Sequence, residues 1–177
     1  MRYTGRYHSP LGGITLGSDG EALTGPWFAG QRYFNSGPSE NTVGQDLPIF
    51  DETRRWLDCY FSGRVPGPPP LLRPSGSPFR LSVWAILCRI PYGQTTTYGA
   101  IARELAQANG LAHMSAQAVG GAVGHNPISL IIPCHRVVGS GGLLTGYAGG
   151  IDKKARLLAL EGADMRGSSI SKTRGAL

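Results

Sequence analysis

The stretch Asn126-Pro-Ile-Ser-Leu-Ile-Ile-Pro-Cys-His-Arg-Val-Val138 carries the strongest signal in this chain. Its β-branched residues 128–132 predict a buried strand that leads to Cys134, and His135 follows directly. The thiolate is the nucleophilic form of cysteine, and a nearby histidine can take up the thiol proton. Consecutive residues of a strand point to opposite faces, so this pairing requires a kink, for which Pro133 is suited, or a bridging water.

A histidine that acts as a base is usually oriented by a third group, often a carboxylate. The C-terminal half of the chain holds few acids, namely Glu104, Asp152, Glu161 and Asp164. Glu161 is the best candidate because it ends the apolar stretch 157–160, although a solvent-facing glutamate is the alternative. For Cys134 the alternative to a reactive thiol is a small buried core residue.

Two short helices precede the cysteine. Thr97 predicts an N-cap for a helix over residues 98–108, and Ser115 predicts one for a helix over 116–123. Two helices joined by a tight connection resemble a helix-turn-helix, the motif that places its second helix in a DNA groove.

The second of these helices consists almost entirely of small residues. Gln117 is its only long polar side chain, between Ala116 and Ala118, and Gly120 and Gly121 follow. Adjacent glycines weaken a helix by about 1 kcal/mol each, so a compensating benefit is expected. Close approach to nucleic acid and tight packing against another helix both remain open.

The remaining pattern predicts an α+β protein. Residues 1–35 alternate polar and apolar side chains between turn signals, which indicates short antiparallel strands. Helices are predicted over 47–62, 79–90 and 151–161. The Pro/Gly/Ser-rich stretch 64–78 is predicted to be irregular. The expected domains are 1–63 (small α/β), 64–78 (linker, or a proline-rich ligand for a partner), 79–162 (mostly helical) and 163–177 (flexible basic tail).

Charge and cysteine content narrow the class of protein. The 177 residues carry a net charge of +6, and all of it lies in residues 79–177. This points to a polyanionic partner, or in part to a solvated tail. Three cysteines without Cys-x-x-Cys spacing predict neither a disulfide framework nor a zinc site, and Cys59 and Cys88 are expected in the core. No signal segment or membrane span is predicted, so an intracellular, cytoplasmic location is expected.

On these residues the chain resembles the O6-alkylguanine-DNA alkyltransferases. The resemblance is strong over residues 79–162 and weaker over 1–63. The matching segments are Ile132–Val138, Ala118–Gly121, Asn126-Pro127, Gly146–Gly150, Lys154, Leu157-Leu158, Glu161-Gly162, Phe79, Val83-Trp84, Ile90–Gly93, Thr97-Tyr98, and, less specifically, Ser9–Gly12 and Tyr60-Phe61.

The resemblance implies repair of DNA by a single-turnover transfer, without metal or cofactor. A guanine alkylated on O6, or a thymine alkylated on O4, is flipped out of duplex DNA and gives its alkyl group to Cys134. It also implies a ribonuclease-H-like N-terminal domain and a winged helix-turn-helix-like C-terminal domain. The protein is expected to be a monomer that binds the minor groove of double-stranded DNA without sequence preference, associated with the nucleoid.

The resemblance further assigns roles to individual residues. His135 activates the thiol through a water, Glu161 orients His135, Asn126 ties the recognition helix to the active-site segment, and Tyr98 protonates the leaving guanine. Arg136 is expected to be structural. The carbonyls of Cys134 and Val137 read the base. The remaining expected contacts are with the substrate, at Tyr147, Ala148 and Gly149, and with DNA, at Thr97, Ala116, Gln117, Ala118, Gly120 and Gly121.

Two positions depart from the family pattern. Gln117 stands where relatives usually carry an arginine that fills the gap left by the flipped base, so slower or weaker flipping is expected. Ala148 stands where serine is common, which leaves a backbone N–H for O6 and more room for bulky alkyl groups. Three other functions remain open: a lesion-binding protein of the alkyltransferase-like kind, a cysteine hydrolase and a DNA-binding regulator.

Overall fold

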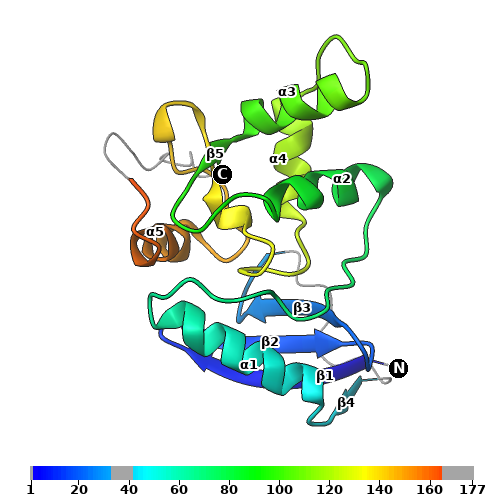
Figure 1. The fold of residues 1–177 in the computed structure, drawn as a ribbon, viewed down its shortest axis with the longest axis vertical. Helices are drawn as coiled ribbons and strands as arrows, with labels where there is room; N and C mark the ends of the chain where they lie inside the picture. The colour runs from blue at the N-terminus through cyan, green and yellow to red at the C-terminus, as the bar shows by residue number, and fades with distance from the viewer. Residues whose placement is uncertain (1, 33–41, 165–177) are drawn as a thin grey trace, which may run out of the picture.

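The computed structural model describes residues 2–32 and 42–164. Figure 1 shows a sheet with one helix at one end of the molecule and the helices α2–α5 at the other. This arrangement confirms the predicted α+β class. Most of the expected basic tail, residues 165–177, lies outside the described residues.

The N-terminal sheet has the strand order β3-β2-β1-β4. Strands β1 (Arg2–Ser9), β2 (Gly12–Ser18) and β3 (Leu23–Phe28) pair antiparallel, as predicted. A fourth strand lies beyond the predicted range 1–35: β4 (Thr42–Gly44) pairs parallel with β1 at one edge of the sheet. The chain re-enters the sheet at the free edge of β1 and runs in the direction of β1.

Helix α1 (Pro48–Phe61) packs by its apolar side, and the prediction of a helix over 47–62 is confirmed. Pro48 occupies the first turn, where its missing N–H costs nothing. Phe50, Leu57 and Tyr60 are fully buried. The irregular segment that follows is held against the sheet, since Leu23 N donates to the carbonyl of Leu71 at 2.8 Å.

The C-terminal half contains four α-helices within its described residues. The caps predicted at Thr97 and Ser115 are confirmed: their hydroxyls accept from Ala100 N at 3.1 Å and from Ala118 N at 3.3 Å. The connection 109–115 is longer than the tight turn that was expected. No helix in the described ranges is long and apolar enough to cross a membrane. The helices are α2 (Pro78–Leu87), α3 (Tyr98–Ala108), α4 (Ala116–Gly124) and α5 (Ile151–Leu160).

The predicted strand over residues 128–132 is wrong. This segment is a buried turn in which Leu130 has φ +70°. Asn126 satisfies the backbone groups that a neighbouring strand would otherwise pair. Its Oδ1 accepts from Ile128 N at 2.9 Å, and its Nδ2 donates to the carbonyl of Ile132 at 2.7 Å. The strand pairing in this half is limited to β5 (Thr96–Thr97) and β6 (Val137–Val138) among the residues described.

The prediction that Cys59 and Cys88 belong to the core is also wrong. Cys88 is exposed and Cys59 is partly exposed. The buried side of α2 is formed by Val83, Trp84 and Leu87, and Cys88 lies one residue beyond it, where the helix ends. Cys134 is the buried cysteine.

Candidate active site

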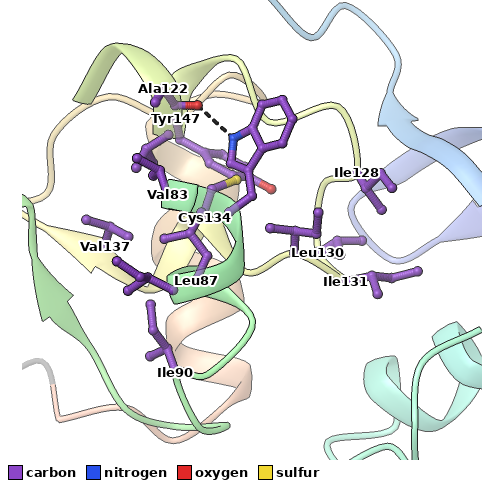
Figure 2. Close-up of a cluster of buried hydrophobic side chains, with 14 of the residues drawn as sticks. Val83, Leu87, Ile90, Ala122, Ile128, Leu130, Ile131, Cys134, Val137 and Tyr147 are labelled. Carbon is purple, nitrogen blue, oxygen red and sulfur yellow. Dashed lines mark hydrogen bonds between the residues drawn. The ribbon is translucent and has the colours of Figure 1, made fainter. Parts of the chain in front are cut away.

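Cys134 lies inside the main apolar core rather than at its edge. Its side chain is only 4% exposed. Figure 2 shows its sulfur within a cluster of buried side chains that includes Val83, Leu87 and Tyr147. A thiol placed so deeply is shielded from solvent, so anything that reacts with it must first enter this cluster.

The kink that was expected at Pro133 is present in the backbone. Pro133 has φ −83° and ψ 64°, and residues Cys134–Arg136 form a single turn of 3₁₀ helix, η1. Successive residues of a 3₁₀ helix point about 120° apart instead of to opposite faces. The two side chains therefore leave the backbone on neighbouring sides.

His135 is paired with Glu161 in the interior. Its Nε2 lies 2.7 Å from Glu161 Oε1, and both side chains are buried. Burial alone would raise the pKa of Glu161, but hydrogen bonds from His135, Arg136 and Tyr60 outweigh it and lower that pKa to about 2. An ionised carboxylate only accepts hydrogen bonds, so Nε2 carries the proton.

The other nitrogen of His135 is left with a lone pair. Nδ1 is buried and has no hydrogen-bond partner among the described residues. Burial lowers the pKa of His135, and the Glu161 carboxylate offsets this only in part. His135 is therefore a neutral imidazole with an unoccupied acceptor, the state that a general base requires.

Glu161 is held by donors from several parts of the chain. Arg136 binds both of its oxygens, with Nε 2.8 Å from Oε2 and Nη2 3.0 Å from Oε1. Gly93 N donates to Oε2 at 3.1 Å, and the Tyr60 hydroxyl donates to Oε1 at 2.7 Å. Arg136 Nη1 also donates to the carbonyl of Ile90 at 2.6 Å. Because charge-assisted and bidentate hydrogen bonds are strong, the carboxylate has a single position.

The thiol of Cys134 is balanced between opposing influences. Burial raises its pKa, whereas a hydrogen bond from Asn126 and the charge of Lys154 lower it. Lys154 is fully buried and donates to the carbonyls of Val137 at 2.6 Å and Thr145 at 2.7 Å. Burial lowers the pKa of Lys154 to about 8. The net result is a protonated resting thiol that needs a base.

The expected substrate contacts Tyr147, Ala148 and Gly149 lie in one loop beside this site. The Tyr147 ring is buried and meets the His135 ring edge to face, with centroids 6.4 Å apart. A Cβ on Gly149 would lie 2.8 Å from Tyr147 Cε1, so only glycine fits against the ring there. The carbonyl of Ala148 accepts from Arg32 N at 2.9 Å, which links this loop to the N-terminal half.

Two further expected site residues, Tyr98 and Val137, both lie close to Lys154. The Tyr98 ring centroid is 6.0 Å from Lys154 Nζ, and its hydroxyl approaches the carbonyl of Thr145 at 3.5 Å, which is a weak hydrogen bond. The carbonyl of Val137 accepts from Lys154, as described above. The carbonyl of Cys134 accepts from Val137 N. Each carbonyl keeps a second lone pair.

Helix α4 presents the expected DNA-binding residues on its outer side. Val119, Ala122 and Val123 face inward, and Trp84 Nε1 donates to the carbonyl of Ala122 at 2.9 Å, the dashed line in Figure 2. A Cβ on Gly121 would meet nothing within 4 Å, and one on Gly120 would make only ordinary contact, at 3.7 Å, with the Tyr98 ring. Packing within the chain therefore does not explain these two glycines. The exposed positions of this face are Ala116, Gln117, Ala118 and Gly121.

Thr97 differs from these residues. It is half-buried, and its hydroxyl caps α3 by accepting a hydrogen bond from Ala100 N.

Family models match both halves of the chain. The model of the DNA-binding domain of 6-O-methylguanine DNA methyltransferase matches residues 78–163, and the model of its ribonuclease-like domain matches residues 2–66. This chain belongs to that family. The methylated-DNA–protein-cysteine methyltransferase of Haemophilus influenzae is 40% identical over 88% of this chain and 83% of its own length. That of Mycobacterium tuberculosis is 42% identical over 86% of this chain and 88% of its own.

Solved methyltransferase structures have the same fold. The crystal structure of Mycobacterium tuberculosis OGT in complex with DNA superposes with a TM-score of 0.77 at 38% identity, over 91% of this chain and 92% of that one. An O6-methylguanine-DNA methyltransferase from Pyrococcus kodakaraensis gives a TM-score of 0.57 at 24% identity, which supports the fold alone.

Sequence reasoning gave no role to Tyr60 or Lys154 in this methyltransferase site. Lys154 carried a weak signal, because it shares the buried side of α5 with Leu157 and Leu158. A lysine in an apolar stripe is rarely buried without a specific partner. Tyr60 belongs to the weaker family match over residues 1–63, but nothing in the sequence connects its hydroxyl to Glu161, 101 residues away.

Proposed function

We propose that Cys134 receives the alkyl group of O6-alkylguanine in DNA and retains it as a thioether, so that each molecule reacts once. The supporting observation is the buried His135–Glu161 pair, which leaves His135 Nδ1 without a partner on the residue next to the only buried thiol of the described chain. O4-alkylthymine is proposed as a second substrate, because it offers the same alkyl–oxygen bond. The family membership of the chain supports this repair chemistry.

The reaction that we propose balances one proton and one alkyl group. The Cys134 thiol gives its proton to His135 Nδ1 through a bridging water, and Glu161 stabilises the resulting imidazolium. The thiolate attacks the alkyl carbon from the side opposite O6, the S–C bond forms, and the C–O bond breaks. The guanine leaves with the electron pair and takes a proton from Tyr98. The proton held by His135 then replaces it through solvent, so that one proton passes overall from the thiol to the guanine. Lys154 supports the transient thiolate by its charge.

The burial of Cys134 implies that the damaged base must leave the DNA stack. A base within a duplex cannot reach a thiol that is 4% exposed inside an apolar cluster. We propose that the base is flipped out and enters beside Tyr147, Ala148 and Gly149, where the carbonyls of Cys134 and Val137 accept from its exocyclic amine.

The outer side of α4 is the proposed contact with the minor groove. Its small residues allow the helix backbone to come close to DNA, and Gln117 is the side chain available to occupy the space of the flipped base. The charge of +6 supports binding that is nearly independent of sequence and sensitive to salt. A monomer in the cytoplasm, associated with the nucleoid, remains our expectation.

Stoichiometry tests this proposal. The protein is mixed with increasing amounts of duplex DNA that carries one O6-methylguanine, and the repaired lesion is counted. We expect repair to stop at one lesion per protein molecule. Continued turnover would contradict the proposal and favour a hydrolase. Selective binding without repair would favour a lesion-binding protein and focus attention on Gln117.

A further inference from the structure

Tyr60, in the N-terminal half of the chain, reaches the carboxylate of the proposed alkyl-transfer site. Tyr60, on α1, is fully buried, and its hydroxyl donates to Glu161 Oε1 at 2.7 Å. The same hydroxyl lies 3.3 Å from His135 Nε2. Of the donors that hold the Glu161 carboxylate, which also include Arg136 and Gly93, Tyr60 is the one from the N-terminal half.

The direction of these hydrogen bonds follows from the charges. Burial, and next the charge of Glu161, raise the pKa of Tyr60, so the phenol stays protonated and donates. His135 Nε2–H and the Tyr60 hydroxyl both donate to Oε1, and Arg136 Nη2 is a third donor to that oxygen. Oε1 is therefore shared between the proposed base and a side chain from the other half of the molecule.

Aromatic neighbours on several sides hold the Tyr60 ring in place. Trp56 stacks on it with centroids 5.6 Å apart and planes 7° apart. Phe61 and Tyr92 meet it edge to face, at 5.3 Å and 5.9 Å. A ring enclosed in this way has little freedom to rotate, so the hydroxyl is directed at Oε1 before any substrate arrives.

We propose that Tyr60 is a positioning residue for alkyl transfer, which holds Glu161 so that His135 keeps its proton on Nε2 and its acceptor at Nδ1. The N-terminal half then contributes to the rate of the reaction and not only to the stability of the fold. This inference rests on the function proposed above.

Removing the Tyr60 hydroxyl changes the base in a definite direction. Glu161 Oε1 loses one donor, so the carboxylate attracts the proton of an imidazolium more strongly, and His135 holds a proton up to a higher pH. The other charged or titratable groups near His135 are Arg136 and Lys154, which oppose its protonation, and Cys134 and Tyr147, which are uncharged at rest. None of these is altered by the substitution Tyr60→Phe.

The test compares Tyr60→Phe with Tyr7→Phe. Tyr7 is a matched control because its hydroxyl also donates to a carboxylate, Asp58 on α1, at 2.9 Å, but outside the site. Single-turnover methyl transfer from an O6-methylguanine duplex is measured across pH 5–9, with lesion affinity measured in a Cys134→Ala background. Imidazole ¹⁵N chemical shifts report the protonation of His135.

We expect Tyr60→Phe to slow transfer roughly tenfold, a fraction of the 10²–10⁴ that general base catalysis typically contributes. The acidic limb of its rate profile and the titration of His135 should both move to higher pH, at unchanged lesion affinity. Tyr7→Phe should match the wild type. The inference is overturned if Tyr60→Phe has the rate and pH profile of the wild type, or if its loss of rate only follows the unfolded fraction in urea. Failure of the wild-type protein itself to transfer methyl would instead reject the proposed function.

Discussion

The interior around Glu161 and the outer side of α4 differ in how far the chain itself supplies the neighbours of their residues. The Glu161 carboxylate accepts hydrogen bonds from four residues of the chain, namely Tyr60, Gly93, His135 and Arg136. On α4, Gln117 and Gly121 face outward, and an added Cβ at Gly121 meets nothing. The Glu161 carboxylate is thus paired within the isolated protein, whereas the outer side of α4 has space for a partner.

This difference separates the two tasks that we assign to the molecule. Preorganised polar groups in a water-excluded interior favour chemistry, because they need not reorganise during the reaction. A bare helix of small residues contributes little to folding and allows close approach to DNA. Changes in the interior should therefore alter rate and stability together, while changes on α4 should alter DNA binding and leave the fold intact.

The largest expected effect comes from Glu161→Gln. The substitution keeps the shape but removes the charge, so His135 loses its orienting carboxylate and Arg136 is left buried without a counter-charge. We expect methyl transfer to slow by about 100-fold or more, and stability in urea to fall by about 3–5 kcal/mol. Glu104→Gln is the control, because Glu104 pairs with Arg89 on the surface and should change stability by less than about 1 kcal/mol. Equal effects of the two substitutions would contradict this account of the interior.

Acid should weaken the interior in a defined pH window. The pKa of Glu161 falls from 4.5 to about 2 on folding, so the folded state binds this proton more weakly than the unfolded state. The stability that it contributes is complete above about pH 4.5 and is lost as pH falls toward 2. Each tenfold change in proton affinity is worth about 1.4 kcal/mol, which gives roughly 3 kcal/mol. Urea midpoints between pH 2 and 6 measure this loss, and the slope should be shallower in Glu161→Gln.

On α4, Gln117→Arg should strengthen the contact with duplex DNA. The longer, charged side chain can fill the space of the flipped base and contact phosphate, so we expect repair of duplex DNA to become several-fold faster. The slope of log affinity against log salt should steepen by about 1. Gln107→Arg, on the exposed side of α3, controls for added charge alone. No gain in the rate of duplex repair would count against a weak Gln117 finger.

The smallest expected effect, that of Gly121→Ala, tests most specifically whether the outer side of α4 contacts DNA. Gly121→Ala has room for its Cβ and should stabilise α4 by up to about 1 kcal/mol. The same methyl group should obstruct close contact with DNA, so affinity for duplex should fall while thermal stability rises. Gly124→Ala, at the last residue of α4, controls for helix propensity. A stabilised Gly121→Ala with unchanged DNA affinity would remove the reason for assigning this side of α4 to DNA.

Sequence alone predicted the parts of this molecule that depend on local pattern. The caps at Thr97 and Ser115 and the helix over 47–62 follow from side chains close to them in the chain. The pairing of His135 with Glu161 was expected because few acids lie in that half and one ends an apolar stretch. Local patterns were sufficient where the composition of the chain left few possible partners for a residue.

Two kinds of feature were beyond that reasoning. The segment 128–132 has the composition of a strand, but Asn126 pairs its backbone groups and it folds as a buried turn. Tyr60 was recognised as an apolar residue of its helix and as part of the weaker family match, but without a role, because its hydroxyl bond to Glu161 depends on how the two halves pack. Contacts between distant segments leave no periodicity in a single sequence.

The most direct test of the central claim locates the transferred methyl group. The protein is allowed to react with a duplex that carries one O6-trideuteromethylguanine, and the label is mapped by peptide mass spectrometry. Our account predicts one label per molecule, on Cys134, although Cys88 is the more exposed thiol. Label on Cys88 or Cys59, or no covalent label while the lesion is lost, would contradict it.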